Sequence, residues 1–220
     1  NLGTIAQNGI ISRDELSRMG IDAICNDNQR LDRCLDHISV SISWPNWQLF
    51  YRFQKQNGMD EQHWCVLIIN PNVLWQLPCF FAAENAASSS ESQIIESERA
   101  TAQAFERMFT DEGAQRLGLT RQKLSLADHF PTNHQAEVLV ERQIPFDRVM
   151  RIIVYDDFGK EFAMQQLPLS CHAMLKKNKE AFQRRSDWTH WIEARRSVEG
   201  GVQDVTRAPD YDMFGPDEIP

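Results

Sequence analysis

A glutamine and a glutamate two residues apart, Gln135 and Glu137, stand where a polar segment runs into an apolar one. Residues 131–134 are typical of a loop, and residues 136–140 are apolar apart from Glu137. Side chains two apart on a strand point to the same face, so Gln135 and Glu137 are predicted to project together. Burying a carboxylate at the start of a strand costs folding free energy unless the group is paired, and a chain retains such a group where it has a functional role. The pair suits a reaction through a positively charged sugar, in which the carboxylate stabilises the cation and the amide orients the acceptor.

The same pattern would also arise from a solvent-facing pair on an edge strand, so other residues must support the chemistry. Arg30 lies in a polar segment, and an arginine can bind a diphosphate through two parallel hydrogen bonds. Ser41 lies on the hydroxyl face of an alternating segment, and Tyr51 follows it. A hydroxyl and an aromatic ring can hold a nicotinamide group. Each residue also has a plainer interpretation. Arg30 could be a surface arginine, Ser41 part of a solvent-exposed sheet face, and Tyr51 a core aromatic residue.

Composition restricts the class of protein. The 220 residues carry a formal net charge of −8, which argues against a simple nucleic-acid coat protein. Five widely spaced cysteines show no zinc-binding spacing, so we expect no metal site and reduced thiols in a cytoplasmic protein. The sequence has neither the apolar run of a membrane span nor the start of a signal peptide.

The order of predicted elements indicates an α+β fold rather than a regular alternation of strands and helices. Residues 201–220 are acidic and contain several prolines, so we expect one domain over residues 1–200 and a flexible tail. Strands are predicted at 37–43, 64–69, 135–140 and 149–155. The unbroken apolar run of residues 64–69 predicts a strand that is buried on both faces. Helices are predicted at 13–19, 47–54, 73–76, 93–110, 120–127, 176–185 and 187–196.

Several stretches, taken in order, resemble a known family from Asn1 to about Tyr155. They are the opening Asn-Leu-Gly-Thr-Ile, Arg30-Leu31-Asp32, residues 38–53, the loop 81–87, and Gln135 to Val140 with Ile144-Pro145. Together these resemble the DarT-type ADP-ribosyltransferases, bacterial toxins that modify bases in DNA. The resemblance implies an ADP-ribosyltransferase-type fold, with two small sheets around an NAD cleft and peripheral helices.

The resemblance also implies the activity and the roles of individual residues. ADP-ribose would pass from NAD to a nucleobase, most simply in single-stranded DNA. Glu137 and Arg30 would be catalytic, with Arg33 as the alternative to Arg30. The remaining positions divide between the two substrates: Arg30, Ser41, Tyr51 and Asn1 for NAD, and Gln135, Asn85 and His134 for the acceptor.

Other interpretations stay open from the sequence. The acceptor could be RNA or a protein side chain, or the chain could be a non-catalytic binding module with the same fold. The resemblance implies a macrodomain-type antitoxin as partner. Family members carry a histidine-containing NAD-binding segment before Asn1, so either the sequence is truncated there or the pocket is incomplete. We also expect a basic group to hold nucleic-acid phosphates: Lys176, Lys177, Lys179, Arg184 and Arg185.

Overall fold

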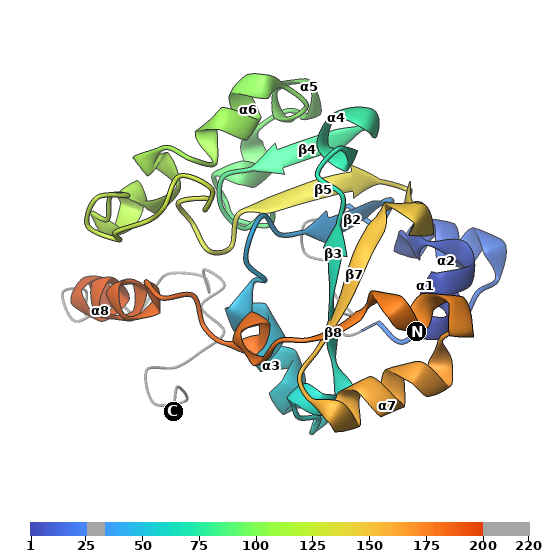
Figure 1. Cartoon of the computed structure of the whole chain (residues 1–220). Coiled ribbons are helices and arrows are strands. Elements are labelled where there is room, and N and C mark those ends of the chain that lie inside the picture. Colours follow the sequence, from blue (N-terminus) through green and yellow to red (C-terminus); the bar gives the residue numbers. More distant parts are fainter. Residues whose placement is uncertain (26–33, 200–220) are drawn as a thin grey trace.

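The computed structural model describes residues 1–25 and 34–199, which form two three-stranded sheets, a two-stranded ribbon and short surrounding helices (Figure 1). This arrangement confirms the prediction of an α+β fold with two small sheets. The strands are β1 (Ile10–Ile11), β2 (His37–Val40), β3 (Cys65–Ile69), β4 (Cys79–Ala82), β5 (Glu137–Glu141), β6 (Gln143–Ile144), β7 (Val149–Val154) and β8 (Leu175–Lys177). The α-helices are α1 (Leu2–Asn8), α2 (Arg13–Met19), α3 (Trp47–Asn57), α4 (Val73–Gln76), α5 (Glu96–Arg99), α6 (Ala102–Arg107), α7 (Asp157–Gln166) and α8 (Trp188–Glu199). The 3-10 helices are η1 (Glu61–His63), η2 (Glu91–Gln93), η3 (Asp111–Leu117), η4 (Phe146–Arg148), η5 (Leu169–Met174) and η6 (Lys179–Phe182).

The first sheet has the order β2-β5-β4, with β5 antiparallel to both neighbours. As predicted, Ala136, Val138 and Val140 share one apolar core, which also contains Ala104 of α6. Figure 1 shows α5 and α6 above this sheet. Because side chains alternate along a strand, Glu137 points away from the face that packs on α6. Glu137 therefore lies on the opposite face of the sheet.

The second sheet has the order β3-β7-β8, in which β8 runs parallel to β7. Its core joins Ile152 and Val154 of β7 to Leu2 of α1 and Ala163 of α7. The prediction that residues 64–69 form a strand buried on both faces is wrong, because β3 is an edge strand and Ile68 is 41% exposed.

Side-chain caps begin the helices that the sequence predicts best. Ser12 Oγ accepts a hydrogen bond from the Glu15 main-chain nitrogen at 3.4 Å, and α2 ends at Gly20 with a left-handed φ of 64°. Asn46 Oδ1 accepts from the Leu49 nitrogen at 3.3 Å and begins α3, which is the predicted 47–54 helix extended by one turn. Helices 73–76 and 187–196 are also confirmed, as α4 and α8.

Three predicted helices are wrong. The predicted helix 93–110 is divided into α5 and α6, because Thr101 Oγ1 accepts from the Ala104 nitrogen at 3.1 Å and caps a new helix. Residues 120–127 form turns and not a helix. The predicted helix 176–185 is replaced by β8 and η6, where the Asn178 side chain accepts from the Glu180 nitrogen at 2.9 Å.

The strand predicted at 37–43 ends at Val40, and the chain then bends, with a φ of 64° at Ser43. None of the helices formed by residues 1–25 and 34–199 is long and apolar enough to span a membrane.

All five cysteines are free thiols, and burial raises the pKa of Cys65 and of Cys79 to about 11. Those two thiols stay protonated at neutral pH and are poor nucleophiles. The predicted tail, 201–220, lies outside the described residues.

Candidate functional site

Glu137 is the first residue of the central strand β5, and its side chain is buried, with 7% exposed. Its partner on β4 is Ala82. On the other side, β2 pairs with β5 up to Val40 and Val138. Ser41 directly follows Val40, the last paired residue of β2, and Ser41 is exposed. The carboxylate and a hydroxyl are thus placed at the same end of the sheet.

The loop over residues 130–135, directly before Glu137, is held by main-chain and side-chain hydrogen bonds. The Thr132 nitrogen donates to the Met108 carbonyl at 2.8 Å, and Asn133 Nδ2 donates to the Gly113 carbonyl at 2.7 Å. Asn133 Oδ1 accepts from the Gln135 nitrogen at 2.8 Å. Gln135 therefore lies in a turn, and the expectation that it belongs to the strand beside Glu137 is wrong.

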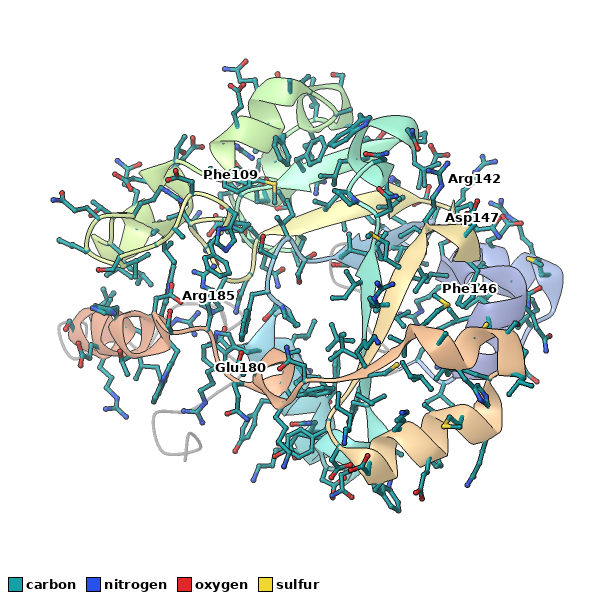
Figure 2. All side chains as sticks on the ribbon, viewed as in Figure 1. Phe109, Arg142, Phe146, Asp147, Glu180 and Arg185 are labelled. Atoms are coloured by element: carbon teal, nitrogen blue, oxygen red, sulfur yellow. The ribbon has the colours of Figure 1, made fainter. Side chains whose placement is uncertain are left out.

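Arg185, labelled in Figure 2, lies before α8 and binds two main-chain carbonyls of this loop. Its Nη1 donates to the Pro131 carbonyl at 2.8 Å and its Nη2 to the Thr132 carbonyl at 2.9 Å. Asp187 accepts from Arg185 Nε at 2.7 Å and from Nη2 at 2.6 Å, and it also accepts from Trp191 Nε1 at 2.7 Å. Arg185 and Asp187 are almost fully buried, so the pair fixes the loop from within the protein.

Gln48 of α3 is the point at which the polar side chains of the loop meet. Its Oε1 accepts from His134 Nε2 at 3.0 Å and from the side-chain amide of Gln135. The His134 ring stacks on Trp47 at a centroid distance of 5.2 Å and meets the edge of Trp191 at 4.7 Å. Burial, with the positive charges of Arg185 and Arg195, holds the pKa of His134 well below its usual range. His134 is therefore a neutral side chain that helps to orient Gln135.

The other predicted site residues are distributed around this centre. Tyr51 lies one helical turn after Trp47 on α3. Asn85 lies in the turn after β4, where its Oδ1 accepts from the Ala87 nitrogen at 2.9 Å. Asn1 bonds the main chain of Ile24, with its Nδ2 donating to the carbonyl at 2.7 Å and its Oδ1 accepting from the nitrogen at 3.0 Å.

The structure therefore brings the side chains of His134 and Gln135 together at Gln48, shortly before Glu137 in the chain, with Tyr51 on the same helix as Gln48. Arg30 and Arg33, the two alternatives for the NAD diphosphate, lie outside the described residues. Asn1 holds the segment that leads towards them, because Ile24 is close to the end of the first described range.

The basic group expected to hold phosphates does not act as one surface. Arg185 is buried and bonded to Asp187, so its assignment to phosphate binding is wrong. Lys177 Nζ forms an ion pair with Asp157 at 2.7 Å. Lys179 lies over the Tyr155 ring, with its Nζ 4.8 Å from the centroid.

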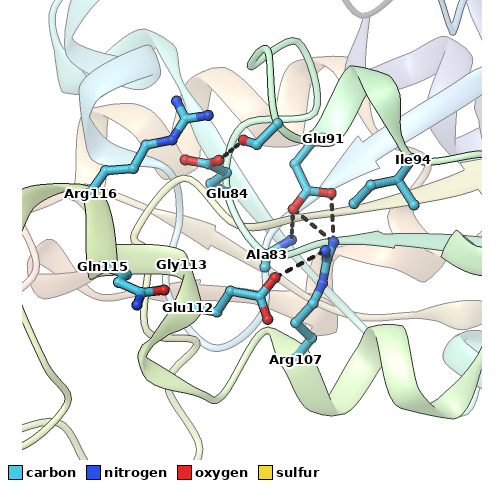
Figure 3. A pocket seen from close by; sticks show the side chains of 10 residues that line it. Ala83, Glu84, Glu91, Ile94, Arg107, Glu112, Gly113, Gln115 and Arg116 are labelled. Atoms are coloured by element: carbon cyan, nitrogen blue, oxygen red, sulfur yellow. Dashed lines mark hydrogen bonds and ion pairs between the residues drawn. The ribbon is translucent and has the colours of Figure 1, made fainter.

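A cavity of about 460 Å³ lies beyond the end of β4, and none of the predicted site residues lines it (Figure 3). Three of its charged side chains pair with one another: Arg107 bonds Glu91 at 2.8 Å and Glu112 at 3.3 Å. Burial raises the pKa of Glu91, against the opposing effect of Arg107. At Gly113 an added Cβ would lie 2.6 Å from the Ala83 carbonyl oxygen, so glycine permits this close packing.

Two residues that position the loop were not predicted as such from the sequence. Gln48 gave a weak signal, as a polar residue among aromatic and aliphatic neighbours on the predicted helix. Arg185 gave none, because an arginine in a basic run is usually exposed. Its partner Asp187 stands at the start of the predicted helix 187–196, where an aspartate usually serves as a cap.

Residues 1–189 match the family model described as "ssDNA thymidine ADP-ribosyltransferase, DarT". The chain belongs to the DarT family. No curated protein matches the sequence.

Two solved structures are similar to this chain at low sequence identity. The structure titled "Thermosipho africanus DarTG in complex with ADP-ribose" is 14% identical with a TM-score of 0.51, and the match covers 83% of this chain and 48% of that chain. The structure titled "Thermus sp. 2.9 DarT in complex with NAD+" is 12% identical with a TM-score of 0.47, and the match covers 83% of this chain and 91% of that one. The chain thus spans about half the length of the Thermosipho protein.

Proposed function

We propose that this protein transfers ADP-ribose from NAD to thymidine in single-stranded DNA. The observation that carries the proposal is the buried Glu137 carboxylate at the start of the central strand, directly after a loop that is bonded on several sides. The family description supports thymidine in single-stranded DNA as the acceptor. The Thermosipho DarTG structure is a complex with ADP-ribose, the group that NAD donates, which supports NAD as the donor.

In this reaction the bond between nicotinamide and ribose C1′ breaks, and nicotinamide leaves with the bonding electrons. Positive charge develops on the sugar, and a preorganised carboxylate at Glu137 stabilises that charge. A thymine atom donates an electron pair to form the new bond to C1′, and the proton that this atom carried passes to solvent. Gln135, oriented by Gln48, faces the acceptor in this proposal together with His134 and Asn85.

NAD is held in the proposal by Arg30 through its diphosphate, and by Ser41, Tyr51 and Asn1. Ser41 is supported by its position directly after the Val40–Val138 pair, at the end of the sheet where Glu137 begins β5. For Asn1 the supporting contact is indirect, because its side chain fixes the main chain of Ile24. The reaction as written requires no metal ion, and residues 1–25 and 34–199 contain no cluster of metal-binding side chains.

In the test, the protein is incubated with labelled NAD and one possible acceptor, which is single-stranded DNA, single-stranded RNA, duplex DNA or a protein extract. Label on single-stranded DNA alone is expected, since pairing and stacking hide the base edges of a duplex. Mass spectrometry of short oligonucleotides that contain or lack thymidine identifies the modified base. Label on protein alone would overturn the proposal, and label on RNA alone would change the acceptor.

A cytoplasmic location is part of the proposal, because both proposed substrates occur there. We propose a domain over residues 1–200, supported by a helix α8 that reaches Glu199. A macrodomain-type antitoxin is the proposed partner, and the DarTG name of the Thermosipho structure supports a toxin–antitoxin pair. Co-expression with such an antitoxin should relieve growth inhibition caused by this chain.

A further inference from the structure

Cationic and aromatic side chains from two distant segments of the chain meet beside the site. The guanidinium of Arg184 lies 4.4 Å from the ring centroid of Trp188, and 5.9 Å from the centroids of Trp47 and Tyr51. Lys55 Nζ lies 5.4 Å from the Tyr51 centroid. Lys55, Arg184 and Trp188, which gather around the Tyr51 ring, form what we name the Arg184 cluster. Lys55 is exposed, and Arg184 and Trp188 are half-buried, so the cluster reaches the surface.

The Arg184 cluster is continuous with the loop that precedes Glu137. Trp47, Tyr51 and Lys55 are spaced by four residues, so they follow one face of α3. Trp47 stacks on His134, and Gln48 bonds Gln135. At 1.5 Å per residue, this face extends about 12 Å from Trp47 to Lys55. The surface thus begins at the side of the site that would orient the acceptor and leads away from it.

The side chains of the neighbouring residues Arg184 and Arg185 lie in different environments. Arg185 is buried and holds the loop, whereas Arg184 lies among aromatic rings at the surface. The segment before α8 therefore connects the loop directly to the Arg184 cluster.

We propose that the Arg184 cluster binds the single-stranded DNA on which the enzyme acts, an inference that rests on the proposed function. Proteins that bind single strands combine cations for the phosphates with aromatic rings on which bases stack. Every base has a face that can stack, so such a surface accepts many flanking sequences. With a net charge of −8, the chain as a whole does not attract a polyanion, and a local cluster has to supply the contact.

Direct binding of a fluorescent single-stranded oligonucleotide, measured by polarisation without NAD, tests the cluster separately from catalysis. The variants are Arg184→Gln, Lys55→Gln and Trp188→Ala. The matched controls are Arg151→Gln, an exposed arginine on β7, and Trp75→Ala, a 68% exposed tryptophan on α4. Thermal unfolding of each variant shows whether it is folded, and Trp188→Phe restores a stacking ring.

Each of Arg184→Gln and Lys55→Gln should weaken binding and reduce the slope of log K against log salt by about 0.7. Trp188→Ala should weaken binding about tenfold with an unchanged salt slope, because stacking and not charge is lost. Trp188→Phe should recover most of the affinity. The controls should bind like the unmodified protein.

Cluster variants that are folded and bind DNA as the controls do would overturn the proposal. An increased KM for NAD with unchanged DNA affinity would also overturn it and would assign the rings to the adenine of NAD. If the unmodified protein binds DNA through the cluster but transfers no ADP-ribose, the proposed function fails and the binding surface stands. If the unmodified protein transfers ADP-ribose to DNA and the cluster variants bind and react as it does, the proposed function stands and the binding surface fails.

Discussion

Arg185 and Thr132 are 53 residues apart in the chain, yet Arg185 Nη2 donates a 2.9 Å hydrogen bond to the Thr132 carbonyl. Thr132 is fully buried, and Arg185 is only 3% exposed. The loop before Glu137 is therefore fixed by a charged side chain from the end of the domain.

Arg185→Ala should lower the free energy of unfolding by about 3–5 kcal/mol, because it leaves the Asp187 carboxylate buried without its cation. Urea denaturation followed by tryptophan fluorescence measures this loss. The double variant Arg185→Met with Asp187→Asn removes both charges and should be more stable than Arg185→Ala. A single variant as stable as the unmodified protein would contradict this account of the pair.

Gln48→Leu should reduce kcat for transfer to DNA about tenfold, because the Gln135 amide loses the acceptor that orients it. The KM for NAD should change less than kcat, since Gln48 contacts the acceptor side of the site. Steady-state kinetics separate the two constants. The matched control is Gln56→Leu, an exposed glutamine on the same helix. Equal effects of the two variants would show that Gln48 has no positioning role.

Glu137→Ala should reduce the rate of transfer by a factor of about 10² or more, as expected when one electrostatic stabiliser is removed. Circular dichroism should show an intact fold, because the strand keeps its main-chain pairing with β2 and β4. The control Glu141→Ala removes a carboxylate from the other end of the same strand. Near-normal turnover of Glu137→Ala would remove this residue from the mechanism.

The pH dependence of stability should depend on His134. Its pKa in the folded protein lies well below the ordinary 6.5, so below that pH the unfolded chain binds a proton that the folded chain does not. Stability should therefore fall as pH decreases from about 6.5, by at most about 1.4 kcal/mol per pH unit from this residue. Urea denaturation between about pH 7.5 and 5.5 should show a smaller loss in His134→Gln than in the unmodified protein. The same pH dependence in both proteins would show that His134 is protonated without cost.

Arg30→Ala should weaken NAD binding much more than Arg33→Ala, because the resemblance assigns the diphosphate contact to Arg30. Calorimetric titration with a slowly reacting NAD analogue measures both affinities. The opposite order would assign the contact to Arg33.

The sequence predicts the parts of the site that depend on local chemistry. Residue type and alternation identify Glu137 and its apolar neighbours Val138 and Val140. Short side-chain caps such as Ser12 and Asn46 predict where helices begin, since the capping partner lies only three residues away.

Contacts between distant segments were not predictable in the same way. Gln48 and Gln135 are 87 residues apart, and nothing in either local pattern indicates that they meet. The predicted helix over residues 176–185 also failed, because pairing of β8 with β7 overrides the local helical preference. Tertiary contacts therefore decided both the role of Gln48 and the conformation of the segment that carries Arg185.

The position of β5 between β2 and β4 has a consequence for the order in which the chain can fold during synthesis. Both outer strands precede β5 in the sequence, so they leave the ribosome before the strand that pairs with them. Until β5 appears, their hydrogen-bonding edges have no partner in this sheet, and such edges promote aggregation. Arg185 emerges later still, and the loop before Glu137 becomes fixed only then. A ribosome-bound fragment that ends before Arg185 therefore contains Glu137 without its ordered surroundings.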